Sequence, residues 1–159
     1  ISLYDHREGR LYEALGPPPP MEVVVLDFGG AVDTLEFNRI DRKDVLASME
    51  PQFQEALYLV REGIARADPA LVGKGATLSA RANQRVLYKP FLEEVIDFSR
   101  SLRAAGVCVA HSGTVAGLLL PCGRGKEALH ACQRAFPQLE ASLSLRLIGG
   151  GIAPLRAKG

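Results

Sequence analysis

The sequence predicts an α+β fold in which a ferredoxin-like antiparallel sheet has its helices packed on one face. A buried strand at 21–26 comes first, and helical patterning then runs from 41 to 106. Two apolar strands, a helix and a last alternating strand follow after residue 106. With the helices grouped together, this order is strand, helix, strand, strand, helix, strand, which is the split β-α-β pattern. The 159 residues are enough for one domain with a real core.

The first twenty residues differ from the rest. The runs 1–4 and 10–15 flank a polar turn that ends in Gly9, and this arrangement predicts a hairpin. The prolines at 17–20 cannot continue a strand ladder and indicate a stiff connector. We therefore place a domain boundary here, with residues 1–20 before it and residues 21–159 as the domain after it.

The remaining elements follow from periodicity and from stop signals. The strand at 21–26 ends in Asp27-Phe28-Gly29-Gly30, and residues 31–40 are predicted as a loop. Four helices are then expected: one from Asp41 to about Ser48, one from Pro51 through Ile64, one from Asp68-Pro69 through Val86, and one from Pro90 that Gly106 ends. The later elements are strands at 107–110 and 118–120, a helix at 123–136 and a strand at 143–148.

The turn His111–Gly117 is the most informative segment, because it is polar and glycine-containing yet lies between two apolar strands. Such a turn leaves backbone N–H groups outside the sheet ladder. It presents them, together with the hydroxyls of Ser112 and Thr114, to a ligand. On one face of the helix expected from Asp68-Pro69 through Val86, Ser79 and Asn83 stand four residues apart, as either a polar binding face or a plain exposed one.

Composition excludes several classes of function. Nineteen Lys and Arg against eighteen Asp and Glu give no support for binding to nucleic acid or to an anionic membrane. No apolar run is long enough to span a bilayer. The three cysteines form no CxxC pair and the three histidines no cluster, so neither a disulfide framework nor a metal site is indicated. A reducing cytoplasm is the expected location. Because the chain begins at Ile1, we expect it to be part of a longer protein.

The sequence partly matches three functional motifs and completes none of them. The segment Val23–Asp33 is similar to the haloacid dehalogenase phosphatase motif, with Asp27 as nucleophile, but Gly29 stands where the second carboxylate belongs. Gly73-Lys74-Gly75 and Gly123–Lys126 are near misses of a phosphate-binding loop. The glycine pair at 73 and 75 costs helical stability, which indicates a close approach to that helix. Ser112 lacks the flanking glycines of a hydrolase elbow.

Four segments in order resemble the C-terminal half of a GHMP-superfamily small-molecule kinase. They are LDFGGAVDTLEFN at 26–38, GKGATLSARANQ at 73–84, LYKP at 87–90 and GVCVAHSGTVAGLLL at 106–120. Within that superfamily, the chain is most similar to members that phosphorylate L-threonine in cobalamin synthesis. The resemblance covers residues 1 to 150 approximately and implies that His111–Gly117 borders the active cleft. Val115-Ala116 departs from the usual Gly-Pro ending of this motif.

The resemblance also implies roles for individual residues and for missing parts. His111, Ser112, Gly113 and Thr114 would line the acceptor side, Asp33 and Thr34 would hydrogen-bond the amino acid, and Ser79, Asn83 and Gln84 would add polar contacts. The family's glycine-serine ATP loop is absent from this sequence. ATP and Mg²⁺ would therefore be bound mainly by a missing N-terminal kinase domain, and this part alone would be inactive, with no catalytic or metal-binding residue of its own. The alternative is a stand-alone module that binds an amino acid.

Overall fold

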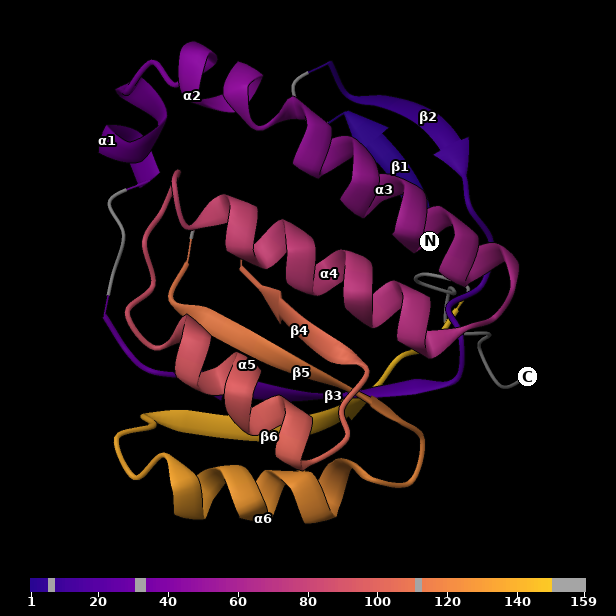
Figure 1. The fold of residues 1–159 in the computed structure, drawn as a ribbon, viewed down its shortest axis with the longest axis vertical. Helices are drawn as coiled ribbons and strands as arrows, with labels where there is room; N and C mark the ends of the chain where they lie inside the picture. Colours follow the sequence, from indigo (N-terminus) through magenta and orange to yellow (C-terminus); the bar gives the residue numbers. More distant parts are fainter. Residues whose placement is uncertain (6–7, 31–33, 111–112, 150–159) are drawn as a thin grey trace, which may run out of the picture.

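The computed structural model describes residues 1–5, 8–30, 34–110 and 113–149. Its elements are arranged as a small hairpin, a larger sheet and six helices (Figure 1). In chain order they are β1 Ser2–Asp5, β2 Arg10–Ala14, β3 Met21–Asp27, α1 Thr34–Arg39, α2 Lys43–Ser48, α3 Glu50–Ala65, α4 Pro69–Asn83, α5 Leu92–Ser101, β4 Gly106–Val109, β5 Val115–Pro121, α6 Gly125–Ala135 and β6 Ala141–Arg146.

The larger sheet has four strands in the order β4-β5-β3-β6, and every neighbouring pair is antiparallel. The first and third strands of the split pattern, β3 and β5, are therefore central, and the other two are edges. Leu118 of β5 pairs with both Val24 of β3 and Val107 of β4, which fixes the register across the middle. This arrangement confirms the ferredoxin-like prediction.

The core lies on one face of this sheet, as the alternation of β3 requires. Val24 and Leu26 point to that face and are fully buried, whereas Val23 and Val25 are only partly buried. Helices α5 and α6 cover the core face, α4 lies alongside β4, and α3 lies beyond α4 (Figure 1). Each large side chain buried here contributes about 1.5–3 kcal/mol. The core members from α4, α5 and α6 are Ala80, Leu92, Val95, Ile96, Ala128 and Cys132, and Phe136, directly after α6, completes the set.

Helix α4 approaches the edge strand β4 closely because two glycines face each other. A Cβ on Gly73 would stand 2.1 Å from the carbonyl oxygen of Ala105, and one on Gly106 would stand 2.0 Å from the carbonyl oxygen of Gly73. Beside this contact, the backbone N–H of Val107 donates to Thr77 Oγ1 at 2.9 Å. The two glycines in the helical pattern are thus explained by packing, as the close approach inferred from the sequence requires.

Several predicted boundaries are wrong. Residues 34–39 form helix α1 within the segment predicted as a loop. Val86 lies beyond α4, because the chain leaves the helix at Asn83 in a turn in which the N–H groups of Val86 and Leu87 both donate to Asn83 O. Gly106 begins β4 instead of ending α5. The reversal after α5 is made by Arg103, in the left-handed conformation at φ 50°. Residues Val115–Gly117 belong to β5, so the turn before it is shorter than predicted.

Glu22 of β3 holds the start of α6. Its Oε2 accepts from the backbone N–H of Gly125 at 2.6 Å, and this hydrogen bond, followed by one from Gly123, lowers the pKa of the carboxyl. The charge therefore adds stability above the pKa of the unfolded chain, and the contribution is lost as pH falls through the folded value. We expect Glu22→Gln to lower the midpoint of thermal unfolding at pH 7 by a few degrees and to lower it less at pH 3.

The matched control is Glu55→Gln, which alters an exposed glutamate in the middle of α3. It should leave the midpoint unchanged at both pH values. Equal midpoints for the Glu22→Gln variant and the original protein at pH 7 would show that α6 begins without this bond.

The three cysteines are free and differ in burial: Cys122 is exposed, Cys108 is half-buried and Cys132 is buried. Burial raises the pKa of Cys108 and raises that of Cys132 to about 11. We expect an aromatic disulfide reagent at pH 8 to modify Cys122 quickly and the other two slowly. Cys122→Ser should abolish the fast phase, and three equal rates in the folded protein would contradict the burial.

No helix in the described ranges combines the length and apolar character needed to cross a membrane.

Candidate acceptor-binding site

Two loops leave the sheet at the same end. The last residue of β3, Asp27, pairs with the first residue of β5, Val115, and the N–H of Ala110 donates to Val115 O at 2.9 Å. The loop after β3 and the turn between β4 and β5 therefore start side by side. A Cβ on Gly30 would lie 3.6 Å from the Thr114 methyl carbon, which is ordinary van der Waals contact. The described residues of the loop after β3 thus lie next to those of the turn between β4 and β5.

The predicted site residues are described to different extents. Asp33, His111 and Ser112 lie outside the described residues. Thr34 is the first residue of α1, and its side chain also lies outside what is described. Gly113 and Thr114 are half-buried in the turn before β5.

Asn83 reaches the level of this turn because α4 and β4 run in the same direction. Gly73 lies against Ala105 and Gly106, and Thr77 bonds Val107, so both chains advance together. From Thr77 to Asn83 the helix advances about 9 Å, and from Val107 to Ala110 the strand advances about 10 Å. Asn83 therefore stands beside the start of the β4–β5 turn, and its side chain is buried, with 7 % exposed.

Ser79 lies one turn earlier and faces a cavity of about 360 Å³ between α3, α4 and β4. That cavity is lined mainly by apolar residues: Phe53, Ala56, Leu57, Val60, Gly75, Ala76, Ala80, Cys108 and Val109. Asn83 is not among its lining residues. Ser79 thus supplies the cavity's hydroxyl, and the structure does not join it to Asn83 in one pocket.

Lys89 is a residue to which the sequence assigned no role. It is buried, with 3 % exposed, and its Nζ has no hydrogen-bond partner within the described part of the chain. Asn83 Nδ2 is also buried without a partner there. An unsatisfied buried polar group costs about 1–3 kcal/mol, and a charged one costs more. Burial accordingly lowers the pKa of Lys89.

The segment that carries Lys89 is firmly held. Gln84 Nε2 donates to Lys89 O at 2.9 Å, and Lys89 N donates to Gln84 Oε1 at 2.7 Å. Two residues further on, the ring of Phe91 stacks on Phe28 with centroids 3.9 Å apart. Because Phe28 follows the end of β3, the connection from α4 to α5 lies at the same end of the sheet as the two loops. The Gln84 side-chain amide is thus used to hold this segment in place.

Neither near miss of a phosphate loop is free to hold a phosphate. The backbone around Gly73 packs against β4, and a Cβ on Gly75 would meet the carbonyl oxygen of Ala56 at 2.7 Å. At the start of α6, the N–H of Gly125 is taken by the Glu22 carboxylate. Within residues 1–5, 8–30, 34–110 and 113–149, no cluster of three or more His, Cys, Asp or Glu is placed to bind a metal ion.

The structure favours a structural role for Asp27. Its Oδ1 accepts from the N–H of Gly29 at 2.9 Å, and Gly29 and Gly30 have φ values of 73° and 87°. The Asp27 carboxylate thus stabilises the turn after β3, and this role is the alternative to that of a phosphatase nucleophile.

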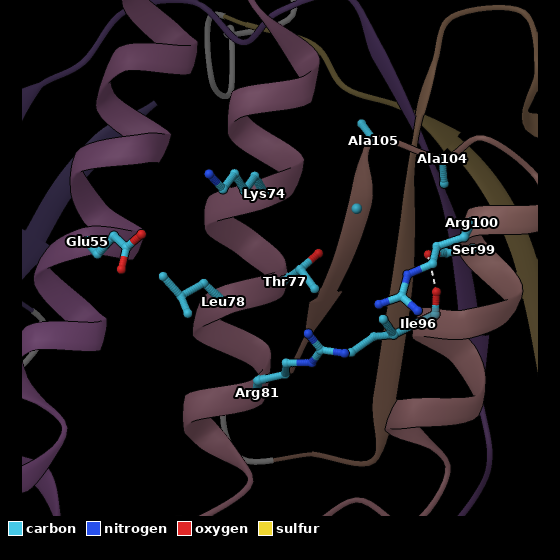
Figure 2. Close-up of a pocket in the computed structure, with 11 residues that line it drawn as sticks. Glu55, Lys74, Thr77, Leu78, Arg81, Ile96, Ser99, Arg100, Ala104 and Ala105 are labelled. Atoms are coloured by element: carbon cyan, nitrogen blue, oxygen red, sulfur yellow. Dashed lines mark hydrogen bonds between the residues drawn. The ribbon is translucent and has the colours of Figure 1, made fainter.

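A second cavity of about 360 Å³ lies between α4, α5 and the start of β4 (Figure 2). Lys74, Arg81 and Arg100 are the cations that line it. Arg81 binds both carboxylate oxygens of Glu93, at 3.2 and 2.9 Å, and Arg100 donates to Asp97 at 2.6 Å. Hydrogen bonding by Glu93 raises the pKa of Arg81. Two of the three cations are therefore paired with carboxylates of α5. The lining residues Ala104, Ala105 and Gly106 place this cavity at the opposite end of β4 from the turn.

Comparison with known proteins identifies the class. Residues 60–138 match the family model described as GHMP kinases C terminal, so this part of the chain is a GHMP kinase C-terminal domain. The fold agrees with two solved structures. A mevalonate kinase from L. major in complex with R-mevalonate has a TM-score of 0.70 and 16 % identity, covering 96 % of this chain and 50 % of that one. A homoserine kinase from Cytophaga hutchinsonii has a TM-score of 0.66 and 15 % identity, covering 90 % of this chain and 46 % of that one.

Two curated relatives are more similar in sequence, and both are L-threonine kinases. The protein from Salmonella typhimurium is 31 % identical over 159 residues, covering 96 % of this chain and 52 % of that protein. The protein from Citrobacter freundii is 32 % identical over 124 residues, covering 78 % of this chain and 43 % of that protein. The chain thus spans about half the length of the curated relatives it matches.

Proposed function

We propose that this chain is the acceptor-binding half of an ATP-dependent kinase that phosphorylates the hydroxyl of L-threonine in cobalamin biosynthesis. The observation that carries this proposal is the sequence similarity to an L-threonine kinase, which extends over 96 % of the chain. The loops at the end of β3 and before β5 support it, because their described residues adjoin and both loops carry residues that the resemblance assigns to the acceptor side. Residues 1–20 would end the N-terminal kinase domain, and residues 21–159 would form the C-terminal domain.

The proposed role of these residues is to position the acceptor. Phosphoryl transfer depends on placing the acceptor hydroxyl in line with the phosphorus atom and on neutralising charge. His111, Ser112, Gly113 and Thr114 would line the acceptor side of the cleft. The Asp33 carboxylate would bind the ammonium of the amino acid, with Thr34, Ser79 and Asn83 as further polar contacts. ATP and Mg²⁺, which supply the phosphoryl group and neutralise its charge, would be held mainly by a segment outside this chain.

The test is a phosphorylation assay of the full protein that carries this chain, with ATP and Mg²⁺ and with L-threonine, L-serine, L-homoserine and galactose as acceptors. Mass spectrometry should detect O-phospho-L-threonine as the main product. The chain alone should form none. Phosphorylation of another acceptor in preference to L-threonine would overturn the substrate. Binding of L-threonine without phosphoryl transfer would instead support an amino-acid-binding module.

A further inference from the structure

Two buried nitrogen donors without acceptors lie on the last residue of α4 and on the connection from α4 to α5. Lys89 Nζ and Asn83 Nδ2 both lack a hydrogen-bond partner in the described ranges, although each residue is more than nine-tenths buried. Buried polar groups in folded proteins almost always have partners, so an orphaned pair needs an explanation. Both atoms are donors, and they therefore lack the same thing, which is an oxygen acceptor.

The backbone around this pair is fixed. The amide of Gln84 bonds the backbone of Lys89 at both N and O, and the N–H groups of Val86 and Leu87 close the turn on Asn83 O. Asn83 and Lys89 are thus held in one compact segment. A lysine side chain has a flexible four-carbon stem, so its ammonium can turn toward an anion while the backbone stays in place.

We propose that the Lys89 ammonium and the Asn83 amide hold the α-carboxylate of the acceptor amino acid. This inference rests on the proposed function, because it names the part of the acceptor that the site recognises. One ammonium matches the single negative charge of a carboxylate. The C-terminal end of α4 carries the negative end of the helix dipole, which opposes any anion there and opposes a nucleoside triphosphate more strongly than a single carboxylate. A bound carboxylate would also favour the charged form of Lys89, which burial otherwise disfavours.

The experiment compares two ligands that differ only in this charge. The full protein is titrated with L-threonine and with L-threoninamide by isothermal titration calorimetry. L-Threoninamide keeps the hydroxyl and the ammonium of L-threonine and has a neutral amide in place of the carboxylate. A hydrogen-bonded charge pair corresponds to about 10- to 100-fold in affinity. We expect L-threonine to bind at least about tenfold more tightly than the amide. Lys89→Met should weaken the binding of L-threonine to the level of L-threoninamide and leave the binding of L-threoninamide unchanged. Asn83→Ala should also weaken the binding of L-threonine.

The matched control is Lys74→Met, which alters an exposed lysine on α4 and should change neither affinity. Lys89→Met should not lower the midpoint of thermal unfolding, since it removes an unpaired buried amine.

Four results would overturn the inference. They are equal binding of the two ligands by the original protein, retained discrimination in the Lys89→Met variant, loss of nucleotide binding instead of L-threonine binding in that variant, and no binding of either amino acid. The proposed function fails separately. A protein that discriminates the carboxylate through Lys89 but forms no O-phospho-L-threonine would keep this site and lose the kinase activity.

Discussion

Replacing Gly73 with valine is expected to detach α4 from β4 and to lower the free energy of unfolding by about 3 kcal/mol or more. A Cβ at residue 73 would stand 2.1 Å from the carbonyl oxygen of Ala105 and 2.7 Å from the N of Gly106. These are backbone atoms, which cannot move aside as the end of a flexible side chain can. The helix must therefore shift, and Thr77 would lose its bond to Val107. Equilibrium unfolding in urea measures the effect.

The control for this substitution is Lys74→Val, the next residue on α4, whose side chain is exposed. It introduces the same β-branched residue into the same helix and costs only about 0.5 kcal/mol of helix propensity. If the Gly73→Val protein were within about 1 kcal/mol of this control, the contact between the helix and the strand would not be as tight as the structure has it.

Replacing Ser112 with phenylalanine is expected to reduce kcat/KM for L-threonine phosphorylation by about 100-fold, with the fold retained. The physical reason is positioning, because a displacement of about 1 Å at the acceptor can cost this much in rate. In the sequence Ser112 stands two residues before Thr114, whose methyl carbon would lie 3.6 Å from a Cβ on Gly30 in the loop after β3. The assay of the full protein gives the kinetic effect, and far-ultraviolet circular dichroism checks the fold.

Ser101→Phe is the matched control for Ser112→Phe, because Ser101 is exposed at the end of α5, away from the turn. It should leave kcat/KM unchanged. If both variants phosphorylate L-threonine at the original rate, the turn has no part in the reaction.

The sheet was predictable because its strands carry their own signal. The β-branched run of β3 and the apolar run of β5 can be satisfied only by burial, and their order along the chain defines the split pattern. Helix α1 and the true end of α5 were not predictable in this way. The chain turns after α5 at Arg103, which has a left-handed conformation usually adopted by glycine. An arginine at this position gives no sequence signal for the turn.

The glycines of α4 show how one pattern admits two interpretations. Gly73-Lys74-Gly75 is close to a phosphate-loop motif and is also what a helix needs where another backbone passes close by. Sequence alone favoured packing, through the cost of glycine in a helix, and the contact with Ala105 and Gly106 confirms it.

Lys89 was beyond sequence reasoning for a physical reason. A lysine is nearly always exposed. The burial of Lys89 accompanies the hydrogen bonds between the Gln84 amide and the Lys89 backbone and the stacking of Phe91 against Phe28. The stacking contact joins parts of the chain that are far apart in sequence. The adjoining of Gly30 and Thr114, by contrast, follows from the strand order once the sheet is antiparallel.

The central claim is that the loop after β3, the segment around Asn83 and Lys89, and the turn before β5 form one site for the acceptor amino acid. The most direct test is a titration of the full protein with L-threonine, followed through the backbone amide resonances by nuclear magnetic resonance. We predict shifts that cluster at Gly30, Lys89, Gly113 and Thr114 and spare the amides around Lys74 and Arg100. Shifts centred on Lys74 and Arg100, or none at saturating L-threonine, would contradict the claim.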